Sequence, residues 1–354
     1  MKVVQVNSPF IISIDEVGQL ATQLKLYIWN KGDAEPTEPN YILSKAVPSL
    51  INRKCDYNIS NYLQEFIEPI SAVRTDIIEE ENVKCWCFFK VETFTGASIK
   101  DLTLISTENY VGLNGWTDYM VGQQIANDTK LSLATYNHCK NLFIPSNYGY
   151  FNLLLDTTVT QFLIHYENIN GEYNETYVDN GIIFLKIPYS NVNLSNPELP
   201  CLIAIYNQTE DYIDSTLQSI PIEECKYQPI ECAFQNARGG WQFLTFFKAS
   251  TNSISVKGSE FNLLPNETNY NPLRGQSKVF NLNGNQTIKC NTGWVDENYS
   301  ILMQDLLLSE TVLIDDKPAK VKTNSLTFKT SLKDKMINYE IDFEYSYDLK
   351  NNVV

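Results

Sequence analysis

The sequence predicts a mainly β fold, with tandem antiparallel β-sandwich-like domains and one amphipathic helix packed on the C-terminal sheet. Three observations lead to this prediction. Apolar and polar residues alternate with a period of two in several short segments, as they do in strands with one buried face. Charged residues make up only 19% of the 354 residues, which is low for the surface of a helical enzyme. One stretch near the C-terminus has helical periodicity instead.

The first predicted domain spans residues 1–105 and is expected to be a β-sandwich. In its first long strand, Leu24, Leu26 and Ile28 fall on one face, and the residues between them fall on the other. A polar loop with two prolines follows, and a later strand is expected to end near Gly96. Short alternating strands separated by turns are typical of a sandwich.

The second predicted domain spans residues 106–230 and repeats this pattern. Asn170 and Gly171 form a tight-turn pair between two segments of strand-like sequence, which predicts a hairpin. The segments 181–190 and 200–208 are short and mostly apolar, as in strands that are buried on both faces. We therefore expect a second sandwich-like domain.

The third predicted domain spans residues 231–354 and ends in the most regular strand of the chain. Its apolar row alternates with polar, mostly acidic residues, as a half-buried antiparallel strand requires. The row consists of Ile337, Tyr339, Ile341, Phe343, Tyr345 and Tyr347.

One helix is predicted in this domain, near residues 295–309. Asp296 and Glu297 favour a helix start, and no Gly or Pro interrupts the run that follows. None of the side chains on the apolar face is a carboxylate, histidine or thiol, so we interpret this face as core rather than as a catalytic surface. The face consists of Val295, Tyr299, Leu302, Met303 and Leu306.

The charge and hydropathy of the chain exclude two classes of partner. The net charge is −15, and no cluster of Lys and Arg forms the basic face that phosphate groups require. No apolar run reaches the roughly 18 residues of a membrane-spanning helix. We therefore expect neither a nucleic acid nor a membrane as a partner.

The eight cysteines are expected to be reduced and buried. The N-terminal segment lacks the apolar core and cleavage site of a signal peptide, which predicts synthesis in the cytoplasm, where thiols stay reduced. Cys85 and Cys87 flank Trp86 in a predicted strand and are expected to share the face opposite to it. No Cys or His spacing fits a zinc site, so we predict no metal and no cofactor.

No catalytic residue is predicted. The chain has no nucleophile elbow, no His-Glu-x-x-His pair and no phosphate-binding loop. His138 and Cys139 are neighbours, but adjacent residues of an extended segment point to opposite faces. Trp116 and Tyr119 are the candidates for contact with a glycan or a protein partner. Aromatic residues beside carboxylates also occur in glycosidases, although chance produces such neighbours in a chain with 42 acidic residues.

Three segments within residues 234–348 carry a resemblance to a known group of proteins. They read ARGGWQFLTFFKAS, CNTGWVDENYSILMQDLLLSETVLI and PAKVKTNSLTFKTSLKDKMINYEIDFEYSYD. An Asn-Thr-Gly-aromatic stretch leads into a helix with a Leu-Leu-Ser-Glu end, and a Lys-Thr-Ser-Leu strand and an alternating final strand follow. In these features the chain resembles virion structural proteins, of tail or baseplate type, from tailed phages and prophages of Bacteroidetes hosts.

The resemblance implies a ring-forming tail or baseplate protein that catalyses nothing. Such a bacteriophage protein would be made in the host cytoplasm and located in the virion tail. Its partners would be other copies of itself and other virion tail proteins. The alternative is a glycan-binding adhesin or a receptor-binding module at the tail tip, with a host surface glycan as partner. A glycoside hydrolase is the third hypothesis.

Overall fold

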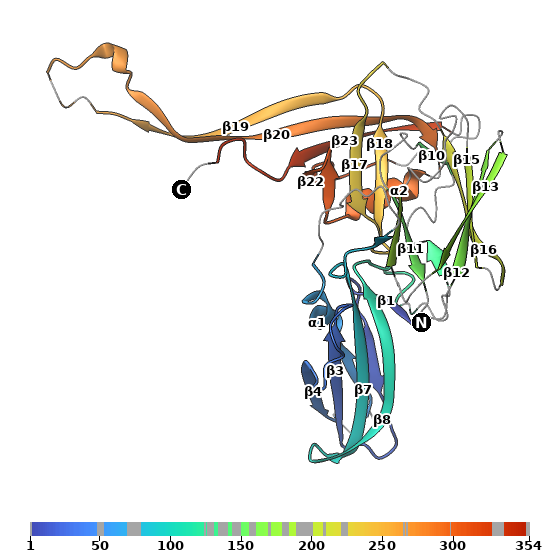
Figure 1. Cartoon of the computed structure of the whole chain (residues 1–354). Helices are drawn as coiled ribbons and strands as arrows, with labels where there is room; N and C mark the ends of the chain where they lie inside the picture. Colours follow the sequence, from blue (N-terminus) through green and yellow to red (C-terminus); the bar gives the residue numbers. More distant parts are fainter. Residues whose placement is uncertain are drawn as a thin grey trace. The chain divides into compact units, whose positions relative to one another are not determined.

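A computed structural model of the chain describes most of its residues, and Figure 1 shows its course. For most of the described residues between 131 and 220, the structure gives the backbone and not the side chains. The described residues are 2–47, 53–68, 79–123, 125, 131–133, 141–143, 150–155, 161–168, 171–178, 184–188, 201–207, 210–220, 226–264, 266, 268–297, 299–327 and 336–351.

The chain forms two compact units, and each is mostly strands, which confirms the predicted mainly β fold. Unit 1 comprises residues 1–223 and 233–244, and unit 2 comprises residues 224–232 and 245–354. The predicted boundary after residue 105 falls inside a continuous strand. The division into three domains stays a prediction.

The N-terminal part of unit 1 is a two-layered β-structure. One layer is a five-stranded sheet in the order β1-β8-β7-β3-β4, antiparallel except for the β1–β8 pair. The other layer is the two-stranded sheet β2-β5, followed in the chain by the short helix α1. The bounds are β1 Val3–Gln5, β2 Ile11–Ile14, β3 Ala21–Trp29, β4 Tyr41–Ala46, β5 Cys55–Asn58, α1 Ser60–Gln64, β7 Trp86–Ser98 and β8 Asp101–Leu113.

The core of this sandwich follows the predicted alternation. Leu24, Leu26 and Ile28 of β3 are at most 1% exposed and belong to one apolar cluster, which confirms the predicted face. Phe89 and Tyr110 stack in the same cluster, with ring centroids 4.9 Å apart. Burial of these side chains between the two layers holds the sandwich together.

The prediction that Cys85 and Cys87 share a face is wrong. Cys87 packs in the core between the layers, whereas Cys85 packs with Trp86 in a separate cluster. Strand β7 begins at Trp86, and Cys85 lies in the preceding turn, where its N–H donates to the carbonyl of Asn82. The alternation of side chains applies only within a strand, so it does not place Cys85.

Two further sheets complete unit 1. Their orders are β6-β14-β11-β9 and β10-β16-β15-β12-β13. Strands β12 and β13 form the predicted hairpin, with Asn168 opposite Gly171, while Asn170 lies outside the described residues. The bounds are β6 Glu79–Glu80, β9 Leu131–Leu133, β10 Asn141–Phe143, β11 Tyr150–Leu155, β12 Gln161–Asn168, β13 Gly171–Val178, β14 Phe184–Pro188, β15 Cys201–Asn207 and β16 Glu210–Ile220.

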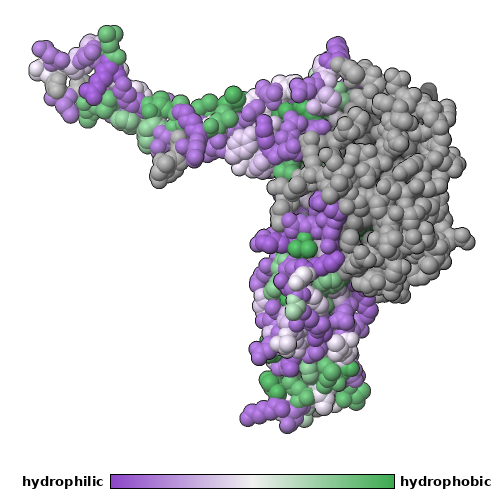
Figure 2. Space-filling view, in the orientation of Figure 1, coloured by the Kyte–Doolittle hydropathy of each residue, from purple (hydrophilic) through white to green (hydrophobic). Residues whose placement is uncertain are grey.

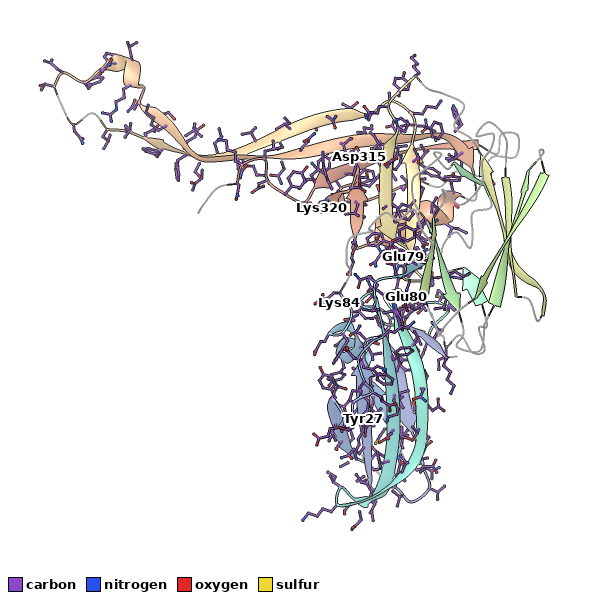
Figure 3. The ribbon with its side chains drawn as sticks, viewed as in Figure 1. Tyr27, Glu79, Glu80, Lys84, Asp315 and Lys320 are labelled. Carbon is purple, nitrogen blue, oxygen red and sulfur yellow. The ribbon has the colours of Figure 1, made fainter. Side chains whose placement is uncertain are left out.

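A buried polar network lies at the β6-β14-β11 part of this unit. The side chain of Asn152 donates to a carboxylate oxygen of Glu81 at 2.8 Å and accepts from the backbone N–H of Trp241 at 2.7 Å. The ammonium of Lys186 lies 3.1 Å from Glu79, which Figure 3 labels, and 3.8 Å from Glu81. Because buried charges need partners, this network favours a fixed structural role over a reactive one.

Unit 2 is built on the long strands of a seven-stranded sheet. The order is β18-β17-β21-β22-β23-β20-β19, and β17 and β18 belong partly to each unit. The helix α2 lies near this sheet, and a short 3₁₀ helix, η2, lies between β19 and β20. The bounds are β17 Ile230–Gln235, β18 Trp241–Phe246, β19 Thr251–Asn262, η2 Pro272–Arg274, β20 Ser277–Asp296, α2 Tyr299–Leu308, β21 Val312–Ile314, β22 Lys317–Val321 and β23 Met336–Tyr345.

Strand β23 has the predicted period of two. Five residues of the predicted apolar row are buried, and Tyr347 lies beyond the strand and is 38% exposed. The strand pairs with β22 on one side and β20 on the other, so it lies inside the sheet. The buried residues are Ile337, Tyr339, Ile341, Phe343 and Tyr345.

The predicted helix is present but begins later than the periodicity indicated. Tyr299, Leu302, Met303 and Leu306 are its buried residues. Val295 is also buried, but it is a residue of β20 and pairs with Ile337. A bulge in β20 explains the difference.

At that bulge, Gly293 adopts a φ of +70° and the hydroxyl of Thr292 accepts from the N–H of Tyr339 at 3.0 Å. The register shifts there, and pairing with β23 then continues to the end of β20. The pairing keeps Val295 and Asp296 extended, although their sequence also suits a helix start.

We expect Asn152→Ala to lower the free energy of unfolding by about 2–4 kcal/mol, because it removes one buried hydrogen bond from Glu81 and one from the Trp241 N–H. Thermal and urea unfolding would measure this loss. The control is Asn252→Ala, which changes an exposed strand residue. Equal stability of the two variants would contradict the structural importance of the network.

Candidate functional site

The most unusual surface of the described residues is a two-stranded ribbon in unit 2, which we call the arm. It consists of residues 251–286, where β19 pairs with the first half of β20. Strand β23 pairs with β20 only from Thr287 onward, and near the base of the arm Leu349 donates its N–H to the Gly284 carbonyl. Figure 1 shows β19 and β20 continuing past the end of β23. All twelve residues of β19 are exposed.

A bulge divides the arm between Lys257 and Ser259. Lys257 pairs with Asn283, but Ser259 pairs with Phe280, so β20 carries an extra residue between these pairs. Asn281 takes up the bulge with a φ of +50°. Gly258 leaves room there, because a Cβ at this position would lie 2.9 Å from a methyl group of Leu282.

Five apolar side chains form a row on one face of the arm, which we call the arm stripe. Ile254 and Val256 alternate along β19, and Val279 and Leu282 lie beside Gly258 between the two strands. Leu349 and Ile254 both lie within 4 Å of the position that a Cβ on Gly284 would occupy. Figure 2 shows apolar surface along this ribbon. The exposed fractions are Ile254 63%, Val256 61%, Val279 54%, Leu282 42% and Leu349 45%.

The opposite face of the arm carries two phenylalanines. Phe261 and Phe280 contact each other edge to face, with ring centroids 5.5 Å apart, and remain 44% and 45% exposed. An isolated two-stranded ribbon is at best marginally stable in water. Apolar side chains on both of its faces therefore favour a partner that covers it.

The arm stripe continues the buried face of the sheet. Ile288 and Cys290 of β20 lie on the same face by alternation and are 4% and 0% exposed. Their partners Phe343 and Ile341 on β23 are also buried. The same sheet face is thus covered at its base and uncovered along the arm. Covering it would contribute about 1 kcal/mol for each half-exposed aliphatic side chain.

The opposite, solvent-facing side of the sheet base carries ion pairs. Lys289 lies 2.5 Å from Glu340, and Lys320, labelled in Figure 3, lies 3.0 Å from Glu344. The hydrogen bond from Lys289 lowers the pKa of Glu340, and the hydrogen bond from Lys320 lowers the pKa of Glu344. Exposed ion pairs of this kind contribute little to the free energy of unfolding, so they are not what holds the sheet together.

The arm differs in charge from the rest of the chain. It contains three basic residues and two acidic ones, a net charge of +1, while the whole chain carries −15. The basic residues are Lys257, Arg274 and Lys278, and the acidic residues are Glu260 and Glu267. The remainder of the chain therefore carries −16, so the arm and the rest of the chain have net charges of opposite sign.

The sequence-predicted contact residues Trp116 and Tyr119 lie on a loop of unit 1. Tyr119 is 94% exposed, and Met120 beside it is 88% exposed. Two N–H groups, of Val121 and Gly122, donate to the carbonyl of Asp118 and hold this turn. Trp116 is partly buried, and its backbone N–H donates to Ala237 at 2.7 Å. The turn therefore presents Tyr119 much more openly than Trp116.

The described thiols are not arranged for chemistry. Cys55, Cys85, Cys87, Cys232 and Cys290 are buried thiols. Burial raises the pKa of Cys87 and of Cys290 to about 12, and burial also raises the pKa of Cys232 well above the usual value of a thiol. A protonated buried thiol packs as a small apolar group and is a poor nucleophile.

The described residues contain no group of three or more metal-ligating side chains, and none of their helices is long and apolar enough to cross a membrane. The neighbours His138 and Cys139 lie outside the described residues. The predicted absence of catalysis, metal and cofactor stays a prediction.

The sequence reasoning missed the arm, although a signal for it was present. Two segments of equal length, 251–262 and 277–288, flank a stretch rich in Asn that contains two prolines and a glycine, which is the pattern of a long hairpin. Their alternation also suits a half-buried strand, and sequence alone does not show whether the apolar face is covered.

No model of a known protein family matches this sequence, and a search of the curated proteins gave no match. The resemblance to phage virion proteins therefore stays an expectation, carried by the segments within residues 234–348.

We expect Cys87 and Cys290 to resist alkylation by iodoacetamide in the folded protein at pH 8. A pKa raised by three units leaves about a thousandfold less thiolate, and burial also blocks the reagent. Peptide mass spectrometry with and without urea would measure the labelling of each site. A Ser253→Cys variant on the exposed arm should label fast in the folded protein and serves as the control. Equally fast labelling of Cys87 would contradict its burial.

Proposed function

We propose that this chain is a structural subunit of a tailed-phage virion, which forms a ring in the tail or baseplate and assembles through its arm. The arm is the observation that carries the proposal. A ribbon with apolar side chains on both faces gains stability when another protein covers it. A structural subunit that meets its neighbours in an assembly supplies such a cover.

The resemblance to virion proteins supports the same proposal from the sequence. It extends over residues 234–348, and this range contains the whole arm and the strands at its base. The segments that carry the resemblance lie on either side of the arm, in β18, the end of β20, α2 and β23. The sheet and helix that hold the arm are thus the part of the chain with the resemblance.

The charge distribution favours copies of this chain as the partner. Like charges on two bodies of −16 repel, whereas an arm of +1 approaches such a body more easily. Contacts through the arm are therefore favoured over contacts between bodies.

Glycan binding is the alternative, and the exposed ring of Tyr119 is the observation that favours it. Aromatic rings supply contact area for the apolar faces of sugars. The neighbouring Met120 and Val121 are also exposed, and such apolar residues suit a protein surface better. Glycan binding that survives Tyr119→Ala would remove this turn as the site.

We expect Val256→Lys and Ile254→Lys to weaken self-association by about tenfold or more, because each places an ammonium group in an interface that excludes water. The matched control is Ser255→Lys, which adds the same charge to the opposite face of β19. Sedimentation velocity over a range of protein concentrations would measure the assembled fraction. The stability of the isolated chain should change little, since all three positions are exposed. An equal loss in Ser255→Lys, or a wild-type chain that never self-associates, would contradict the proposal.

We also expect the chain to be present in purified phage particles, at a copy number that matches a ring. Quantitative peptide mass spectrometry of the particles and imaging with antibody-labelled gold would test this. Label on the tail would support the proposal. Particles that lack the chain would rule out a virion role.

A further inference from the structure

The N-terminal sandwich has an incomplete second layer. Among the described residues, two strands, β2 and β5, face its five-stranded sheet. The hydroxyl groups of Thr22 and Tyr57 lie 2.7 Å apart, which places β5 over β3. A groove of about 380 Å³ lies between β2 and the inner face of β7 and β8. It is lined by side chains that include Val91, Thr93, Ser106 and Glu108. One more strand beside β2 would cover this face.

The edge of β2 that borders the groove pairs with no other strand in the part of the chain that the structure describes. The carbonyl of Phe10 accepts from the N–H of Ile59 on the β5 side. Because successive residues of a strand direct their backbone groups to opposite sides, Ile12 and Ile14 also face β5, and Ile11 and Ser13 face the groove. The backbone of Ser13 therefore offers an N–H and a C=O for strand pairing.

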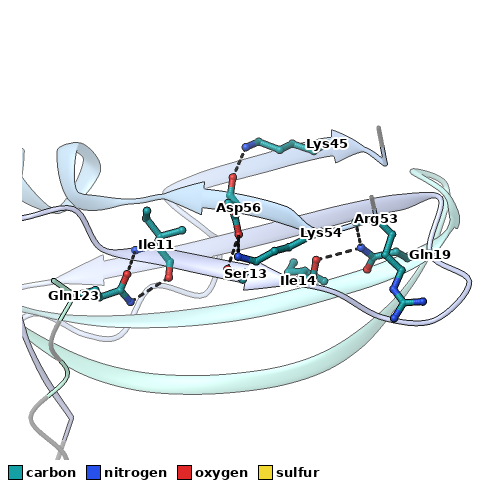
Figure 4. A network of polar contacts seen from close by, with 9 residues as sticks. All are labelled: Ile11, Ser13, Ile14, Gln19, Lys45, Arg53, Lys54, Asp56 and Gln123. Carbon is teal, nitrogen blue, oxygen red and sulfur yellow. Dashed lines mark hydrogen bonds and ion pairs between the residues drawn. The ribbon is translucent and has the colours of Figure 1, made fainter. Parts of the chain in front are cut away.

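At this edge, the side-chain amide of Gln123 forms the hydrogen bonds that a neighbouring strand would form. The amide oxygen of Gln123 accepts from the N–H of Ile11 at 2.8 Å, and its amide nitrogen donates to the carbonyl of Ile11 at 3.1 Å (Figure 4). These are the two bonds that a residue of a neighbouring antiparallel strand would make. Gln123 provides hydrogen-bond partners for the backbone of Ile11 only, and the edge of β2 continues along the groove from Ile11 to Ser13.

We propose that this groove accepts β19 from the arm of a second copy of the chain, which pairs with β2 as an added strand. The inference rests on the proposed function, since it names the surface that the arm meets. A strand added to an open edge gains main-chain hydrogen bonds, and the side chains on its inner face supply specificity.

The sequence of β19 suits this position. It is the last strand of its sheet, so one of its edges is also unpaired within the described residues. Residues 253–257 read Ser-Ile-Ser-Val-Lys. With Ile254 and Val256 against the floor near Val91, the two serines and the lysine face outward.

Charge favours the same arrangement. Asp15 and Glu16 line the groove, and Asp15 is paired with Arg53 at 2.6 Å. Glu16 has no ion pair in the part of the chain that the structure describes, and it is a carboxylate available to Lys257 of the incoming strand. The acidic body and the basic arm thus complement each other at this groove.

The contact joins two different surfaces and is therefore head-to-tail. Each copy supplies one arm and one groove, so the contact repeats from copy to copy until it closes into a ring. It covers the arm stripe and completes the second layer of the sandwich at the same time. A symmetric contact between two arms would leave the groove empty.

The first test uses Ser13→Pro. Proline removes the N–H that faces the groove and places its ring in the path of the added strand. We expect the association constant to fall about tenfold or more. The control is Ser13→Ala, which also loses the hydroxyl bond to Asp56 but keeps the backbone N–H, and which should associate within about twofold of the wild type. Unchanged association of a folded Ser13→Pro variant would overturn the inference.

A cross-linking experiment identifies the occupant even where the proline variant fails to fold. Two chains with different tags would be mixed, one with Ser13→Cys and the other with Ser255→Cys, both on the outer face of the proposed sheet. A short bismaleimide should join the two tags in one product, whereas mixing two Ser13→Cys chains should give none. Cross-linking only within one chain that carries both cysteines would overturn the assignment to a second copy.

The outcomes separate this inference from the proposed function. Loss of association in Val256→Lys, with unchanged Ser13→Pro and no cross-link, would overturn the groove as acceptor and leave the arm as an assembly surface. A wild-type chain that stays monomeric and gives no cross-link would overturn both.

Discussion

Pairing of strand edges is the constraint on which the rest of this structure depends. Each strand carries backbone N–H and C=O groups along both sides, and an open edge attracts further strands. The chain caps part of one edge with a side-chain amide, because Gln123 forms hydrogen bonds with both backbone groups of Ile11. Strand β19 has no such side-chain cap in the part that the structure describes. Its edge is long, exposed and bordered by apolar side chains, so closure has to come from another surface.

The apolar face of the unit 2 sheet is also covered in one part and exposed in another. At the base of unit 2, the apolar face of β20 and β23 is buried, with Ile288 and Phe343 opposite each other. Along the arm, the same face is bare although its side chains remain aliphatic. Evolution of a solvated ribbon would favour polar residues at these positions, since exposed aliphatic rows promote association. The aliphatic side chains of Ile254 and Val256 therefore favour a state in which another surface covers the arm.

The periodicity of the sequence correctly predicted the strands that are buried by other residues of the same unit. The final strand and the buried residues of β3 follow from a period of two, because each lies against a core in the same unit. The arm was not predicted, since alternation is identical whether the covering surface belongs to this chain or to another. Val295 was predicted to lie on the helix because its spacing fits the apolar face of the helix. In the structure it pairs with Ile337 after the bulge at Gly293, and the local sequence does not reveal this non-local pairing. The groove beside β2 was also beyond prediction, because Gln123 lies 112 residues from Ile11.

The net charge of the chain opposes indiscriminate association through the open arm. The bodies carry like charge and repel one another, so two copies approach most easily where an arm of one faces a body of the other. The bulge at Asn281 adds local twist to the arm, and twist limits the flat edge-to-edge stacking of arms. The proposed pairing at β2 would be short, since that strand has four residues and Gln123 already occupies one of its positions. A short acceptor would admit one strand in one place, so the proposed contact would be specific.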